Sequence, residues 1–173
     1  IASCLVGSEM CIRDSATPTE AKATYDAAKQ HADAEYKVAR TSCDSMKANA
    51  KDICLEEAKA AQVKTTAEAE AIYKGTPQAN KKARTDIADA NYKVAKEKCD
   101  DLNGNKKDVC VKEAKAVQTS AIADAKSAQS VTEVRKDARD DKQDANIAVQ
   151  KEKCDALTGD EKSRCIGAAS MGK

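Results

Sequence analysis

Small and apolar residues recur along most of this chain at steps of three and four positions, the spacing of one face of an α-helix. In the middle of the chain, two such faces flank a short polar stretch, residues 100–109. Facing positions in an antiparallel hairpin have residue numbers with a constant sum. The pairs that satisfy this rule are Cys99 with Cys110, Ala95 with Ala114, Tyr92 with Val117, and Ala88 with Ala121. The pattern predicts two antiparallel helices joined by a tight turn, with a disulfide beside the turn.

The same arrangement occurs three times. Each copy has two cysteines with ten residues between them, and the copies begin 55 or 56 residues apart. The predicted disulfides are Cys43–Cys54, Cys99–Cys110 and Cys154–Cys165. In the first copy the other facing pairs are Ala39 with Ala58, Tyr36 with Ala61, and Ala32 with Thr65. Because a fixed period is typical of repeat proteins, we predict an all-α fold. It consists of three tandem antiparallel helical hairpins, each stapled by one disulfide near its turn.

The turn residues fit a helix stop followed directly by a helix start. Gly104 and Gly159 suit the left-handed position just past a helix end, because glycine has no Cβ to make that conformation costly. Asn105 is placed to cap the following helix. The first copy has Ala48 at the position of the glycine, so we expect this turn to be strained.

The hairpin boundaries follow from capping signals. Thr17-Pro18 predicts the start of the first helix, and Lys74–Pro77 predicts the break between the first two hairpins. We expect hairpins at about 17–73, 76–129 and 132–173, within one repeat domain over residues 16–173. Ser130–Glu133 is a weaker boundary: either Thr132 caps a new helix or the helix runs through. The last repeat is more polar and shorter, as expected for the terminal cap of a repeat array.

The first fifteen residues do not fit this repeat pattern. Leu5–Ser15, LVGSEMCIRDS, matches the translation of a transposase-based sequencing adapter, and Ile1–Cys4 fits the adjoining index region in the same frame. The alternative, a remnant of a signal peptide, is disfavoured because charged residues interrupt its apolar stretch. We interpret residues 1–15 as a non-native segment, which removes Cys4 and Cys11 and leaves six cysteines.

Composition narrows the class of protein. Charged residues make up 34% of the chain and aromatic residues only 2%, with no Trp or Phe, so alanine supplies most of the apolar surface. Charges of both signs alternate along the predicted helices, which indicates solvated surfaces rather than a nucleic-acid-binding patch. No apolar stretch is long enough to predict a membrane span.

The cysteines favour disulfides over a metal site. Zinc ligands usually come in close-spaced pairs, whereas here the spacing is long and the single histidine, His31, is far from every cysteine pair. Redox catalysis is also disfavoured, because reactive pairs usually have C-x-x-C spacing. Three structural disulfides predict an oxidising compartment.

No residues form a catalytic, cofactor-binding or metal-ligating motif, so we predict no enzyme activity and no cofactor. We interpret His31 as a surface residue. The four tyrosines fall at helix-face spacing and are interpreted as core residues rather than as a ligand platform: Tyr25, Tyr36, Tyr73 and Tyr92.

The segment Tyr92–Ala116, YKVAKEKCDDLNGNKKDVCVKEAKA, resembles a group of alanine- and lysine-rich repeat proteins predicted to be exported in proteobacteria and often labelled cell-envelope or TolA-like. Its specific core is C-D-x-L-x-G-N-x-K-D-x-C. The resemblance implies export by a cleaved signal peptide, here replaced by the adapter, and it implies no activity or functional residues. We therefore expect a non-enzymatic periplasmic or secreted helical protein with a structural, envelope-stress or binding role and a protein or envelope partner. The alternative is a self-associating coiled-coil subunit that forms oligomers or filaments.

Overall fold

The computed structural model describes residues 18–171, except for the side chains of residues 169–171. This part of the chain consists of helices joined by short turns and contains no strand, so the predicted all-α hairpin fold is confirmed. The helices are α1 (Pro18–Cys43), α2 (Ala48–Lys74), α3 (Pro77–Cys99), α4 (Asn105–Asp155) and α5 (Gly159–Met171). All three predicted disulfides are present, and they join α1 to α2, α3 to α4, and α4 to α5.

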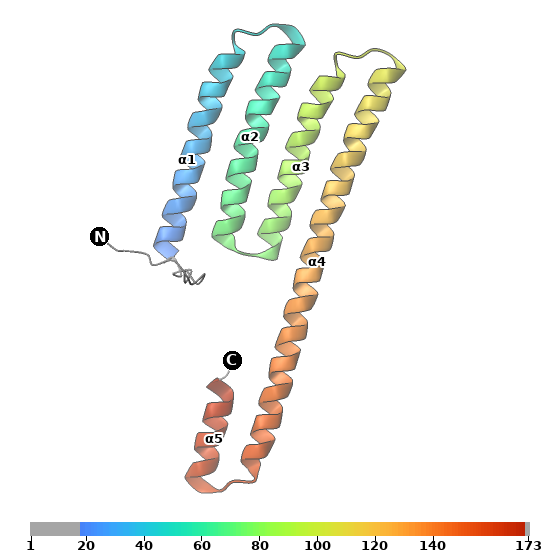
Figure 1. Cartoon of the computed structure of the whole chain (residues 1–173). Coiled ribbons are helices and arrows are strands. Elements are labelled where there is room, and N and C mark those ends of the chain that lie inside the picture. Colours follow the sequence, from blue (N-terminus) through green and yellow to red (C-terminus); the bar gives the residue numbers. More distant parts are fainter. Residues whose placement is uncertain (1–17, 172–173) are drawn as a thin grey trace, which may run out of the picture. The chain divides into compact units, whose positions relative to one another are not determined.

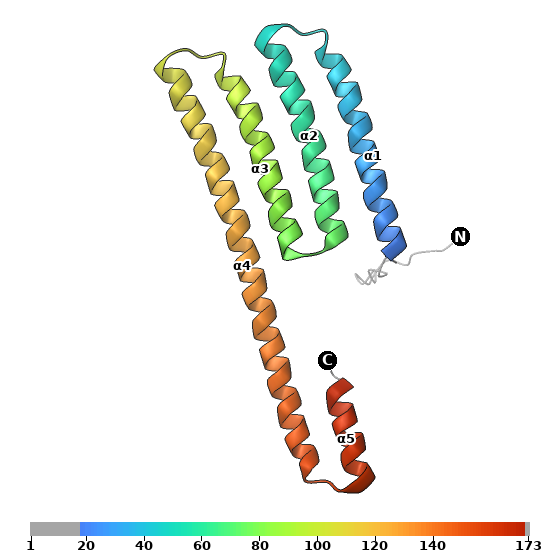
Figure 2. The same ribbon diagram turned by 180° about the vertical axis from the view of Figure 1, so that it is seen from behind.

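The chain divides into two compact units, the first ending at Ile122 and the second beginning at Ala123. In the first unit, α1, α2, α3 and the beginning of α4 lie side by side in a row (Figures 1 and 2). Each helix is antiparallel to the next, so α2 packs against both α1 and α3. The second unit contains the remainder of α4 and α5, which form an antiparallel pair of their own.

The break between the first two hairpins has the predicted chemistry. The Thr76 hydroxyl caps α3 by accepting a 3.1 Å hydrogen bond from the backbone N–H of Ala79, and Pro77 is the first helical residue. Gly75 ends α2 in the left-handed conformation, with φ of 60°, and its N–H donates to the carbonyl of Ala71. A glycine stop followed by a Thr-Pro start therefore reverses the chain within two residues.

No such break occurs near residue 131, because α4 is one continuous helix of 51 residues. The Thr132 hydroxyl does not cap a new helix. It donates a 2.8 Å hydrogen bond to the carbonyl of Ala128, four residues earlier in the same helix. Of the two alternatives at this boundary, the structure has the helix that runs through.

The three hairpin turns place one residue each in the left-handed region. Gly104 and Gly159 have φ of 57° and 62°, and Ala48 has φ of 50°. Ala48 is the only non-glycine residue with positive φ in the described part of the chain. Its Cβ is crowded by the backbone in this conformation, which costs about 1–2 kcal/mol for an L-residue.

Replacing Ala48 with glycine should therefore raise the free energy of unfolding of the first unit by about 1 kcal/mol. The matched control is Gly104→Ala, which should lower it by a similar amount. A Cβ built on Gly104 meets no atom within 4 Å, so only the backbone conformation is penalised there. Urea unfolding of both variants tests this, and a loss of stability in Ala48→Gly would contradict the assigned strain.

The core is thin and consists of small side chains. Every buried apolar residue in the described chain is an alanine or a cysteine, and the largest fully buried side chains are Cys43, Cys99 and Cys154. Burial stabilises by only about 0.8 kcal/mol per CH₂ group, so each alanine adds little. The disulfides therefore carry an unusually large share of the stability.

The predicted facing residues of the second hairpin line one hollow between α3 and α4, but not all of them are buried: Ala88, Tyr92, Ala95, Ala114, Val117 and Ala121. Ala61 and Val117, which the sequence placed opposite Tyr36 and Tyr92, are exposed, and Val117 is 70% exposed. The buried residue on this turn of α4 is instead Gln118, which is only 8% exposed. A glutamine tolerates this position because hydrogen bonds across the hairpin satisfy its amide, as shown below.

Candidate functional site

Each hairpin turn contains the same combination of a disulfide and an ion pair, which we call the turn module. We call the first helix of each hairpin the ascending helix and the second the returning helix. The first cysteine of each pair lies at the end of the ascending helix and is fully buried, and its partner lies about two turns into the returning helix. The Cα–Cα separations are 5.7 Å, 5.7 Å and 5.6 Å. A Cα atom lies about 2.3 Å from its helix axis, so these distances fit helix axes about 10 Å apart, as in ordinarily packed helices.

The ion pair joins the aspartate after the first cysteine to the lysine three residues before the second. The Nζ–Oδ1 distances are 2.9 Å for Lys51–Asp44, 3.0 Å for Lys107–Asp100 and 2.8 Å for Lys162–Asp155. Apolar periodicity alone does not identify these ion pairs. The signal that identifies them is the shared spacing C-D-x6-K-x2-C, which occurs in all three repeats.

The ion pair in the first turn changes the acidity of its carboxyl group. The hydrogen bond from Lys51, and then its positive charge, hold the pKa of Asp44 below its ordinary value of 3.8. A carboxyl whose pKa is lower in the folded state stabilises the fold above the unfolded pKa. That contribution is lost as the pH falls through the folded pKa.

Lys51→Gln should therefore raise the pKa of Asp44 toward 3.8, because the substitution removes the two largest causes of the shift. Carboxyl ¹³C NMR titration of Asp44 measures this directly. Lys107→Gln, in the second turn, is the matched control and should leave Asp44 unchanged. An Asp44 titration curve that is identical in wild type and Lys51→Gln would show that the pair does not form in solution.

A second repeated contact lies deeper in the first two hairpins. In the second hairpin, the Gln118 amide donates to Asp89, its carbonyl accepts a 2.8 Å hydrogen bond from Lys115, and that ammonium lies 5.2 Å from the Tyr92 ring centroid. The four residues form a polar cluster between α3 and α4. Hydrogen bonding and the cation–π contact satisfy the buried polar atoms.

The first hairpin contains the same cluster. Its members are Asp33, Tyr36, Lys59 and Gln62, with a 2.6 Å Gln62–Asp33 hydrogen bond and Lys59 at 5.1 Å from the Tyr36 centroid. At the equivalent positions the third repeat keeps an aspartate, Asp144, but has Ile147 in place of the tyrosine. The cluster was missed in the sequence because only apolar residues were assigned to the helix interface.

The two hairpins of the first unit are joined by contacts between α2 and α3. Near the turns, the Asn49 side chain donates to the carbonyl of Glu97 at 3.0 Å and to the carboxylate of Asp101 at 2.7 Å. Asn49 therefore links two hairpins rather than capping α2, which has no side-chain cap. Further along, the apolar contact is formed by Ala67, Ala71, Ala83 and Ile87.

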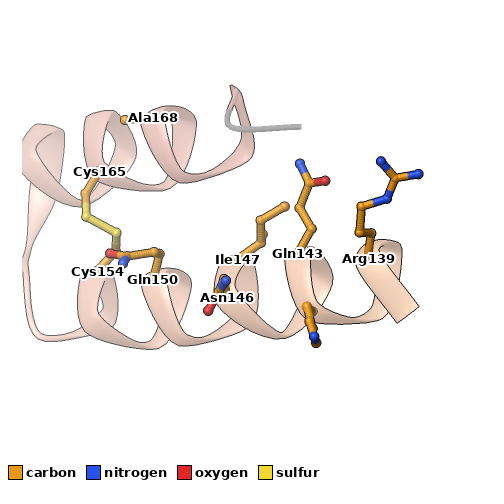
Figure 3. A pocket seen from close by; sticks show the side chains of 9 residues that line it. Arg139, Gln143, Asn146, Ile147, Gln150, Cys154, Cys165 and Ala168 are labelled. Atoms are coloured by element: carbon orange, nitrogen blue, oxygen red, sulfur yellow. A yellow bond between two sulfur atoms is a disulfide. The ribbon is translucent and has the colours of Figure 1, made fainter. Parts of the chain in front are cut away.

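The second unit contains an open groove of about 670 Å³ between α4 and α5. Figure 3 shows the Cys154–Cys165 disulfide at one end of this groove and Arg139 at the other. Gln143 and Gln150 line it at positions occupied by alanine in the first two hairpins, Ala32 and Ala39 in the first. The groove is open, and its lining residues show no nucleophile–base pair.

The remaining candidate residues are on the surface or in simple contacts. His31 is exposed and lies 3.3 Å from Glu35 on the next helical turn. Tyr25 and Tyr73 stack across α1 and α2 with ring centroids 5.3 Å apart. None of the four tyrosines is fully buried.

Within residues 18–171, no group of three or more His, Cys, Asp or Glu side chains is arranged to hold a metal ion. In the same part of the chain, no helix is long and apolar enough to cross a membrane. No family model, curated protein or solved structure matches this chain.

Proposed function

We propose that this chain is a non-enzymatic, exported helical protein, periplasmic or secreted, with a structural, envelope-stress or binding role at the cell envelope. The observation that carries the proposal is the turn module, a disulfide with an Asp–Lys ion pair that recurs in all three repeats. The proposal has two parts, the compartment and the role.

The compartment is supported by the disulfides together with the thin core. Disulfides persist in oxidising compartments and are rare where thiols are kept reduced. A core of alanine and cysteine supplies little burial energy, so such a fold depends on its covalent links. A chain with this construction is suited to the periplasm or to secretion.

The structural role is supported by what the polar residues contact. In the first two hairpins the glutamine of each polar cluster donates to an aspartate across the helix pair and accepts from a lysine of its own helix. The Asp–Lys pairs bridge the turns in the same way. The repeated residues thus maintain the hairpin itself.

The test is the location and redox state of the native protein. Cells that express the intact native gene are fractionated after rapid thiol trapping with a maleimide reagent, and the six cysteines of the repeats are followed. We expect the protein in the periplasmic or extracellular fraction with all six cysteines unreactive. A cytoplasmic protein with six reactive thiols would overturn the proposal. Crosslinking from that fraction, followed by mass spectrometry, then identifies the partner.

The second candidate function is a self-associating subunit that forms oligomers or filaments. The observation that favours it is a set of exposed apolar residues on α1 and α4: Val38, Val109, Val117, Val131, Val134 and Val149. A sedimentation profile that depends on protein concentration distinguishes this candidate from a monomeric binding protein.

A further inference from the structure

The outer faces of α1 and α4 correspond to the two surfaces that meet between α2 and α3. α1 and α3 are the ascending helices of equivalent hairpins, and α2 and the beginning of α4 are the returning helices, at an offset of 56 residues. Between α2 and α3 these surfaces are packed together. α1 and the beginning of α4 are the two outer helices of the row in Figure 1, so each has a neighbouring helix on one side only.

On α3, Ala83 packs with Ala67 and Ala71 of α2, Ala90 lines the groove between these helices, and Ala79 is also buried. The equivalents of these three α3 residues on α1 are exposed alanines: Ala23, Ala27 and Ala34. The position of the half-buried Val94 is taken on α1 by Val38, which is 69% exposed. α1 therefore presents an α3-like surface that no residue of the described chain covers.

α4 presents the matching α2-like surface. The half-buried Ile53 and Ala60 of α2 correspond to Val109 and Ala116, and Val109 is 44% exposed. Asn49, which links α2 to the turn after α3, corresponds to Asn105. The surfaces needed to repeat the α2–α3 contact are thus both present and both exposed, one at each edge of the first unit.

The charges on these faces support pairing between copies. Glu70 and Lys82 line the same groove between α2 and α3. The pKa of Glu70 is shifted mainly by Lys74 and that of Lys82 mainly by Asp86, and each of the two also favours the charged form of the other. The equivalents of these two residues are Lys126, further along α4, and Asp26 on α1. Both signs are reversed together, so the attraction is retained. This paired reversal identifies the occupant as a second copy of the same chain.

Three replacements would make the interface between copies weaker than the α2–α3 contact. His31 and Thr119 take the positions of Ile87 and Val63, so a polar pair replaces an apolar one. Glu56 and Lys93 line the groove between α2 and α3. Their equivalents are Lys112 and Lys37, so in the interface between copies two lysines would face each other. The contact is expected to be reversible.

We propose that copies of this chain stack edge to edge, with α1 of one copy packed against α4 of the next in the geometry of the α2–α3 contact. The two faces differ, so the contact is heterologous, and each added copy exposes a new face at the end. Unless the rotation closes a ring, such a contact extends into an open array. This inference gives the self-associating candidate a specific interface, and it does not depend on the compartment.

Charge substitutions on the purified, oxidised chain test the interface, with association followed by sedimentation velocity at low salt. Asp26→Lys should weaken association about fivefold, because an attractive surface pair becomes repulsive. Adding Lys126→Glu restores the charge arrangement of Glu70 and Lys82 and should return association to the wild-type level. Lys112→Glu removes the like-charge pair with Lys37 and should strengthen association by a similar factor.

The control is Glu68→Lys, which makes the same change in charge at an exposed residue of α2, outside both faces. It should leave association unchanged. Wild type and Lys112→Glu that both remain monomeric up to the solubility limit would overturn the proposal. Equal effects of Asp26→Lys and Glu68→Lys, or no rescue by Lys126→Glu, would overturn it as well, because association would then use another surface.

Discussion

Replacing Cys99 and Cys110 with alanine is expected to lower the free energy of unfolding of the first unit by about 3 kcal/mol, because the disulfide closes a short loop in the unfolded chain. The loss is large relative to the stability of a core made only of alanine and cysteine. All four tyrosines lie in this unit, so tyrosine fluorescence during guanidinium unfolding measures its transition separately.

The matched control removes Cys154 and Cys165, which form the disulfide of the second unit. This variant should leave the tyrosine transition unchanged while it lowers the helicity that circular dichroism detects for the remainder of the chain. Reduced wild-type protein should lose more stability than either double variant. A tyrosine transition that did not shift in Cys99→Ala/Cys110→Ala would show that packing alone maintains the second hairpin.

Ala32→Leu is expected to destabilise the first unit by about 1–3 kcal/mol, the usual effect of inserting methylene groups into a packed interface. Ala32 is 1% exposed on α1, the most buried alanine of the first hairpin. A leucine at this position either separates α1 from α2 or displaces its own side chain from a favourable rotamer. The measurement is again the midpoint of the tyrosine transition in denaturant.

Gln30→Leu is the control for this prediction, because it places the same side chain on the exposed surface of the same helix. Surface changes of this kind usually stay within about 0.5 kcal/mol. If the two leucines had equal effects, close contact between α1 and α2 would not be the reason for alanine at position 32.

Local chemistry made the hairpins predictable from the sequence. The cysteine spacing, the glycines at the turns and the Thr-Pro start of α3 each act within a few residues, and the structure contains all of them. Even the strain at Ala48 followed from a comparison of three turns. These features needed no knowledge of the packing around them.

Two features depended on packing and were missed. The inward position of Gln118 was not visible from hydrophobicity, because its burial depends on partners from two helices. The contact between α2 and α3 is equally hidden, since it joins residues of different repeats such as Asn49 and Asp101. In both cases, comparison of equivalent positions in the repeats would have been more informative than apolar periodicity.

The order of the cysteines has a consequence for oxidative folding. Each disulfide joins cysteines that are consecutive in the repeat region and 11 residues apart, whereas Cys54 and Cys99 are separated by 45. The loop-closure entropy favours the shorter ring by about 1.2 kcal/mol, roughly a factor of eight. When the chain is exported with its N-terminus first, each unpaired cysteine of the repeats therefore pairs with the next cysteine to appear. This pairing is the native one. Such a protein should reach its native connectivity directly, with little need for a disulfide isomerase.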